Sequence, residues 1–192
     1  MYLALIADVI DSKMVQERFD LQKQLEKTLQ KMNELFADYL ASCFTLTLGD
    51  EFQALLKVNA PIFHIIDTLR SEISPTQLRF GIGLGEIVTA IDPLISIGAD
   101  GPAYWNARAA INMVHQKNDY GNTQIYFSSG NEKHDFFVNA LMLQEKPFVR
   151  VGVAVRKKFY KIFLRDLYIV KILASKTWHN HSLSTQVHCL NV

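Results

Sequence analysis

Carboxylates in unusual surroundings are the first candidates for chemistry in this chain. Asp8 interrupts the apolar run YLALIADVI at residues 2–10, where a buried acid is costly unless it is paired, hydrogen-bonded or bound to a cation. Alternatively, the strand ends at Asp8 and the acid caps the next turn. Asp50 and Glu51 follow Gly49 between two β-forming runs, which is typical of a hairpin turn. Turn formation alone would also explain this second acidic pair.

The two acidic positions predict a shared cation site if the strand bearing Asp8 pairs with the hairpin at 43–57. Asp8 and Asp50 would then lie at the same edge of the sheet. Two carboxylates with little basic compensation suit a hard cation that is bridged to substrate phosphates. Mg²⁺ or Mn²⁺ is therefore the expected cofactor.

Three alternating glycines lie in RFGIGLGE, residues 79–86. Gly81, Gly83 and Gly85 share one face of the expected strand and permit close approach of a packed helix or of a ligand. Their spacing is not the dinucleotide-binding fingerprint. Packing and ligand binding are left as equal alternatives.

A second segment that could contact a phosphate is GADGPAYWNARAA, residues 98–110. Asp100 precedes a helix whose N-terminus can attract an anion, and Arg108 on that helix could bind a phosphate through two hydrogen bonds. The simpler interpretation of Arg108 is a surface residue. His64 and His115 stand singly on expected helices and are interpreted as structural.

The elements that must position these residues follow from hydrophobic periodicity and turn signals. Their order, β-α-β-β-α-β-(β)-α-β, predicts an α+β sandwich with one helical layer on a mostly antiparallel sheet. The expected elements are a strand at 2–10, a helix at 14–41, the hairpin at 43–57, a helix at 60–73, a strand at 77–84 continued or paired by 86–91, a loop at 92–101, a helix at 102–116 and a strand at 123–129.

Composition places the chain among ordinary globular proteins. It has 192 residues, of which 49% are hydrophobic and 20% charged, so a core can form without disulfide or metal support. Cys43 and Cys189 suggest no disulfide framework, and no signal peptide or membrane span is expected. A cytoplasmic location is the resulting expectation.

The C-terminal segment differs from the rest in charge. Residues 1–150 carry 13 Lys and Arg against 18 Asp and Glu, whereas residues 151–192 carry seven against one. We therefore expect a folded domain at 1–145 and a basic segment at 146–192 that is divergent or partly disordered, or that arises from a shifted reading frame. Such a segment could bind nucleic acid.

Four sequence blocks together resemble the SatD family, small bacterial cytoplasmic proteins named for acid tolerance. They are ALIADVIDS, FTLTLGDEFQALL, LRFGIGLGEI and GADGPAYWNARAAI, and the resemblance extends from residue 2 to about residue 128. More widely, the same blocks resemble the ferredoxin-like palm fold of class III nucleotidyl cyclases and GGDEF domains, which places helices on one face of the sheet.

The wider resemblance implies roles for individual residues. Asp8 and Asp50 would hold the divalent metal, and Val9 would offer its backbone carbonyl. A nucleotide would be the ligand, and a homodimer is left open. The residues implied in nucleotide binding are Asp11, Ser12, Gly49, Glu51, Asp100 and Arg108.

Several departures from the cyclase pattern favour binding over catalysis. Asp11 and Ser12 stand where cyclases have Gly and Phe, and Leu48 replaces the first glycine of the GGDEF turn. Asn106 and Arg108 are two residues apart, whereas the cyclase transition-state pair is spaced by four. The expected function is metal-dependent nucleotide binding in a regulatory or stress role. The alternatives are an active nucleotidyl cyclase or transferase, and a DNA-binding regulator that uses the basic tail.

Overall fold

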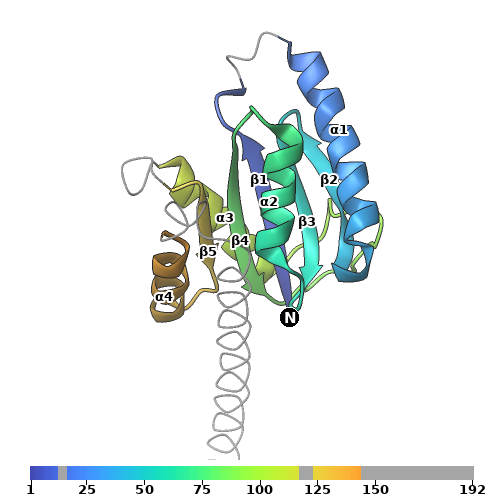
Figure 1. The fold of residues 1–192 in the computed structure, drawn as a ribbon. Coiled ribbons are helices and arrows are strands. Elements are labelled where there is room, and N and C mark those ends of the chain that lie inside the picture. Colours follow the sequence, from blue (N-terminus) through green and yellow to red (C-terminus); the bar gives the residue numbers. More distant parts are fainter. Residues whose placement is uncertain (13–16, 117–122, 144–192) are drawn as a thin grey trace, which may run out of the picture. The chain divides into compact units, whose positions relative to one another are not determined.

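The computed structural model describes residues 1–12, 17–116 and 123–143 (Figure 1). They belong to a compact unit, Met1–Pro147, and a second unit, Phe148–Val192, lies outside the described residues together with the predicted basic segment. The elements are β1 (Tyr2–Val9), α1 (Arg18–Leu35), the short 3₁₀ helix η2 (Ala37–Tyr39), β2 (Leu40–Leu48), β3 (Glu51–Lys57), α2 (Ile62–Ile73), β4 (Leu78–Gly85), α3 (Pro102–His115), β5 (Ile125–Ser128) and α4 (Glu132–Leu143).

One five-stranded sheet in the order β2-β3-β1-β4-β5 organises the domain. The central strand β1 is antiparallel to both β3 and β4, and only β5 runs parallel to its neighbour β4. From β1 to β4 the chain follows the ferredoxin-like β-α-β-β-α-β order. The predicted α+β class and the mostly antiparallel sheet are therefore confirmed.

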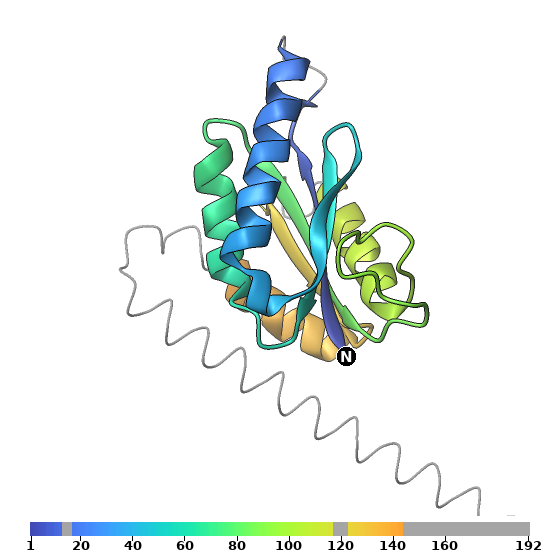
Figure 2. The same ribbon diagram turned by 90° about the vertical axis from the view of Figure 1, so that its right-hand side faces the viewer.

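Helices cover both faces of this sheet. Figure 2 shows α1 and α2 on one side of it and α3 on the other. Ala4 and Ile6 of β1 pack against α3, and β1 is buried along nearly its whole length, so each of its faces needs an apolar cover. The prediction of one helical layer is correct for α1 and α2 and wrong for α3.

The alternating glycines of β4 make room for α3. A Cβ atom built on Gly83 would clash with the Ala103 carbonyl oxygen and the Ala107 amide nitrogen, and it would lie 2.8 Å from the Ala107 Cα. Gly81 and Gly85 meet the same helix in the same way. Of the two alternatives left by the sequence, close helix packing therefore accounts for these glycines.

The chain after β4 leaves the sheet and crosses to the edge strand β2. Residues 86–91 form no strand, contrary to the prediction that they continue the strand at 77–84 or pair with it. The loop that follows them is hydrogen-bonded to the sheet at β2 and β3. The Cys43 amide donates to the Pro93 carbonyl at 3.0 Å, and the Ser42 hydroxyl donates to the Asp92 carbonyl at 2.6 Å. The Gln53 side-chain amide donates to the buried Ser96 carbonyl at 2.7 Å.

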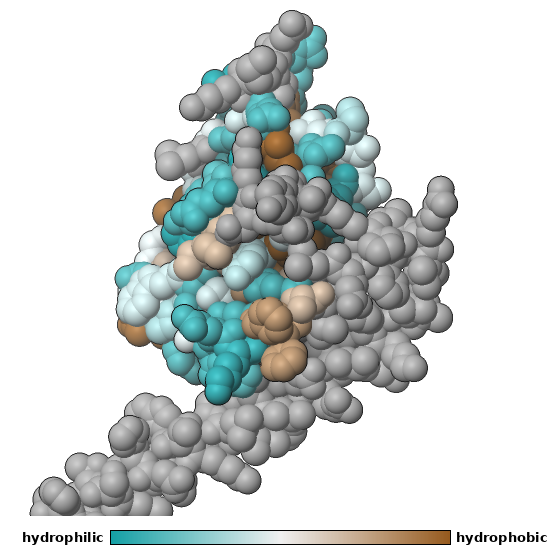
Figure 3. All heavy atoms as spheres, turned by 90° about the vertical axis from the view of Figure 1, so that its left-hand side faces the viewer, coloured by the Kyte–Doolittle hydropathy of each residue, from teal (hydrophilic) through white to brown (hydrophobic). Residues whose placement is uncertain are grey.

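The end of the first helix and the presence of a fourth helix differ from the sequence expectation. The first helix ends at Leu35 rather than near residue 41, because Leu40 already pairs with Leu56 of β3. The helix α4 was not predicted, and its apolar residues explain why: Phe136 and Phe137 are 70% and 68% exposed, so no single apolar face repeats along it. Figure 3 views the α4 side, where apolar groups lie among hydrophilic ones.

Asparagine side chains from two helices bind the backbone of the edge strands. Asn33 of α1 donates to the Phe44 carbonyl of β2 at 3.1 Å and accepts from the Phe44 amide at 2.7 Å. Asn139 of α4 makes the same pair of hydrogen bonds with Phe127 of β5, both at 2.8 Å. At these positions the asparagine side chain makes hydrogen bonds with the strand backbone that a neighbouring strand would otherwise make.

Candidate functional site

The strand register brings three ionisable residues into one row at the end of the sheet where β1 finishes. Asp8 lies directly opposite Glu51 of β3 on one side and opposite Arg79 of β4 on the other. Because side chains alternate along a strand, this row lies on the face that Ala4 and Ile6 present to α3. Asp8 and the hairpin tip therefore meet at the same end of the sheet, as predicted.

The carboxylate of Asp8 is buried and engaged through both oxygens. Its side chain is 9% exposed, with Oδ1 2.8 Å from Arg79 Nε and Oδ2 2.5 Å from His115 Nε2. Asp8 is part of β1, so the alternative in which it ends the strand and caps a turn is wrong. Among the explanations left open for a buried acid, pairing with basic groups is observed.

A second ion pair joins the hairpin to α3. The Arg108 guanidinium donates two hydrogen bonds to Glu51, at 2.6 and 2.8 Å, and the Thr47 hydroxyl donates to Oε1 at 3.2 Å. The Arg108 hydrogen bonds hold the pKa of Glu51 below its ordinary value and raise that of Arg108. We call Asp8, Glu51, Arg79, Arg108 and His115 together the charged cluster.

The turn between β2 and β3 places Asp50 beside this cluster. Gly49 and Asp50 form the turn, Gly49 has a φ of +62°, and β3 begins at Glu51. Asp50 is partly exposed, and its carboxylate makes no hydrogen bond or ion pair with another described residue. Asp50 is therefore an acidic side chain at this end of the sheet that is available to a ligand.

The other predicted residues near β1 have different environments. Val9 is 1% exposed and pairs with Leu78 of β4. Asp11 is exposed with a φ of 54°, and Ser12 is buried at 8% exposure. Residues 13–16, which follow them, lie outside the described part of the chain.

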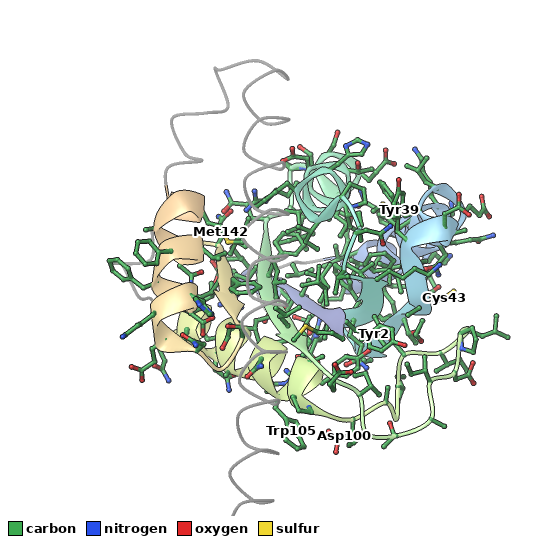
Figure 4. All side chains as sticks on the ribbon, turned by 90° about the horizontal axis from the view of Figure 1, so that it is seen from below. Tyr2, Tyr39, Cys43, Asp100, Trp105 and Met142 are labelled. Atoms are coloured by element: carbon green, nitrogen blue, oxygen red, sulfur yellow. The ribbon has the colours of Figure 1, made fainter. Side chains whose placement is uncertain are left out.

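Asp100 does not join the charged cluster. It precedes the start of α3, which packs near Gly85, and Gly85 pairs with Tyr2 at the opposite end of β1 from Asp8. Its Oδ1 accepts hydrogen bonds from the Trp105 indole at 2.7 Å and from the Gly101 amide at 2.8 Å. Figure 4 views this end of the sheet and shows Asp100 beside Trp105. The structure therefore separates Asp100 from the other residues predicted to bind a nucleotide.

Two members of the cluster, Arg79 and His115, were not among the predicted site residues. His115 was interpreted as structural, but it lies seven residues after Arg108, which places both on one face of α3 two turns apart. That spacing was visible in the sequence. Arg79 could not be selected in this way, because its role depends on β4 lying next to β1 in the sheet.

The oxygen donors present suit magnesium better than zinc. Among the described residues there is no group of three or more His, Cys, Asp or Glu side chains that could hold a metal by itself. Magnesium usually keeps several waters and takes only one or two carboxylates together with substrate phosphates. Asp8 and Asp50 fit that requirement in donor type, while Arg79 and His115 already contact the two carboxylate oxygens of Asp8.

A comparison with known protein families gives a match over most of the chain. The model of the SatD family matches residues 2–175, which extends beyond the predicted boundary at 145. None of the curated proteins matches the chain significantly. A solved structure of a bacterial light-regulated adenylyl cyclase is similar, with 12% identity and a TM-score of 0.48, covering 69% of this chain and 44% of that one. In the part of the chain that the structure describes, no helix is both long and apolar enough to cross a membrane.

Proposed function

The chain belongs to the SatD family, and we propose that its sheet domain binds a nucleotide through a divalent metal ion held by Asp8 and Asp50. The Val9 carbonyl would be a further ligand. The bound nucleotide would serve a regulatory or stress-related role in the cytoplasm, in keeping with acid tolerance. The observation that carries the proposal is the register of Asp8 against Glu51, which brings the end of β1 and the hairpin turn together.

The charge balance supports a cation at this position. Asp8, Asp50 and Glu51 contribute three carboxylates, against the two guanidinium groups of Arg79 and Arg108, before any charge on His115 is counted. A divalent ion would reverse this deficit and would supply electrostatic attraction for a phosphate chain. The two arginines are the groups best suited to hold phosphate oxygens, because a guanidinium donates in a planar fork.

Binding is favoured over nucleotide cyclisation by the position of Asn106. Its side-chain amide donates to the Leu84 carbonyl at 2.8 Å, which fixes α3 to β4. Arg108, two residues later, instead contacts Glu51 at the hairpin. These two side chains are engaged with different strands, so they do not act together as the resemblance to cyclases would require.

The proposal is tested by calorimetric titration of the full chain with ATP and GTP, with Mg²⁺ and with EDTA. We expect binding only with Mg²⁺. Loss of even an outer-shell partner of a metal ligand typically costs 10–100-fold, so Asp50→Asn should weaken binding at least about tenfold. The matched control is Asp38→Asn, which removes the same charge from the exposed 3₁₀ helix η2. Equal affinity with EDTA, or in Asp50→Asn, would contradict the metal site.

A melting experiment gives an independent reading of the same site. A ligand that binds only the folded state raises the melting temperature. Millimolar Mg²⁺ or Mn²⁺ should therefore stabilise the wild-type chain and the Asp38→Asn variant, but not Asp50→Asn. The same shift in all three proteins would show that the ion binds elsewhere.

A further inference from the structure

Asp8, the central proposed metal ligand, already has a cationic partner within the protein. We propose that Arg79 is a built-in competitor of the metal, so that a divalent ion binds Asp8 only as the guanidinium is released. This inference rests on the proposed function. It adds that Arg79 would determine how tightly the metal binds and which co-ligand binds with it.

The geometry of the pair carries the first step. Arg79 Nε lies 2.8 Å from Asp8 Oδ1, and the two side chains are only 23% and 9% exposed. Because little water screens this pair, a guanidinium at that distance opposes a second cation on the same carboxylate. Nor is Oδ2 free, since His115 Nε2 lies 2.5 Å from it. A metal ion that coordinates Asp8 therefore meets a basic group at either oxygen and is repelled by the guanidinium.

The surroundings of Arg79 carry the second step. The next residue on the same face of β4 is Gly81, and the space above it is filled by the backbone of α3 at Ala107 and Ile111. The neighbouring carboxylate, Glu51, is already bound by both terminal guanidinium nitrogens of Arg108. Glu51 is thus paired with Arg108, and Asp50 would hold the metal in the proposed function, so an incoming phosphate is the replacement partner for a released Arg79.

An exchange of partners follows from these two steps. Asp8 passes from the guanidinium to the metal, and Arg79 passes from Asp8 to a phosphate oxygen. The ligand class that satisfies both exchanges at once is a metal-chelated oligophosphate. A metal ion alone leaves Arg79 without a counter-ion, and it should bind weakly for that reason.

The test is binding of Mn²⁺ alone, followed by electron paramagnetic resonance at fixed pH. Arg79→Gln keeps a hydrogen-bond donor beside Asp8 and removes the charge, and it should bind Mn²⁺ roughly tenfold more tightly than wild type, or better. Arg79→Lys keeps the charge and should stay close to wild type. The matched control is Arg70→Gln, which removes a guanidinium that stacks 5.4 Å from the Phe80 ring on the opposite face of β4.

Equal Mn²⁺ affinity in wild type and Arg79→Gln, with loss of binding in Asp50→Asn, would overturn the inference and leave the proposed function standing. No Mn²⁺ binding to Arg79→Gln would overturn the inference, and the proposed function would fall as well only if ATP and GTP also bound equally with Mg²⁺ and with EDTA. An equal gain in Arg70→Gln would reduce the effect to overall charge and refute a specific role for Arg79.

A second measurement needs no variant at position 79. Phenylglyoxal modifies free guanidinium groups, and the modified peptides are identified by mass spectrometry. Mn²⁺ together with tripolyphosphate should protect Arg79 relative to Mn²⁺ alone, whereas Mn²⁺ alone should expose it relative to the metal-free protein. Arg70 should react at one rate throughout. If Arg79 is modified at the same rate with and without bound Mn²⁺, the proposed exchange of partners is refuted.

Discussion

The contact between β4 and α3 leads to a quantitative prediction for Gly83→Ala. The added Cβ would lie 2.8 Å from the Ala107 Cα and would clash with backbone atoms of Ala103 and Ala107. Carbon atoms prefer a separation of about 3.5–4.0 Å, so α3 must retreat by about 1 Å. Backbone atoms cannot rotate out of the way as a side-chain end would, and the shift therefore extends along the helix.

The expected cost is about 3 kcal/mol, at the upper end of the range for overpacked cores. For a domain of this size that corresponds to a decrease of roughly 6–12 °C in melting temperature. Urea unfolding followed by circular dichroism would measure the free energy, and differential scanning calorimetry the temperature.

Gly49→Ala is the matched control for this experiment. Gly49 has a φ of +62° and no neighbouring atom within 4 Å of a built Cβ, so its substitution tests backbone strain without a clash. A left-handed residue costs about 1 kcal/mol when glycine is replaced. If Gly83→Ala costs no more than Gly49→Ala, the close packing of α3 on the glycine face is not the constraint we describe.

Three further predictions concern other parts of the molecule. Glu51→Gln should lower the free energy of unfolding by about 1 kcal/mol at neutral pH, because the pair with Arg108 is partly exposed. Hydrogen bonding from Arg108 lowers the pKa of Glu51, so this contribution is full above the ordinary glutamate pKa and is lost as pH falls through the lowered value. A difference between wild type and variant in urea unfolding that persists in acid would contradict this pH dependence. Asn139→Ala should lower the free energy of unfolding by about 2 kcal/mol and speed hydrogen exchange at the Phe127 amide, because the Phe127 amide and carbonyl lose their hydrogen bonds to Asn139. An unchanged exchange rate at the Phe127 amide would refute this role of the Asn139 side chain. Truncation after Glu145 should leave a soluble protein that melts cooperatively near the full-length temperature, whereas aggregation would show that the predicted domain boundary is wrong.

Local sequence signals predicted the strand, the hairpin and the acidic ends that they bring together. The apolar run around Asp8 and the Gly49–Asp50 turn are short-range patterns. A hairpin that lies beside a central strand is expected to pair with it, and β3 of the hairpin does pair with β1. The identity of the partner of Asp8 is a different matter. Arg79 is 71 residues away, and only the sheet order places it opposite Asp8.

The helix α3 shows what a sequence motif can predict and what it cannot. Asp100 and Arg108 occur in one sequence block, which suggested one site. The seven helical residues from Pro102 to Arg108 alone span about 10 Å, however, so the two ends of this block lie toward different ends of the sheet. The glycine face illustrates the converse. Its pattern signalled close approach of another body, but only the structure identifies that body as α3.

The paired hydrogen bonds of Asn33 and Asn139 restrict how another chain can associate with this domain. A partner that extends a sheet by adding a strand needs unsatisfied backbone groups at the edge. At Phe44 of β2 and Phe127 of β5 these groups are already bound by asparagine amides, so an incoming strand would first have to displace a helix side chain at either edge. Association through helix surfaces meets no such barrier. The same two residues would also hinder intermolecular strand pairing when newly made chains are crowded together.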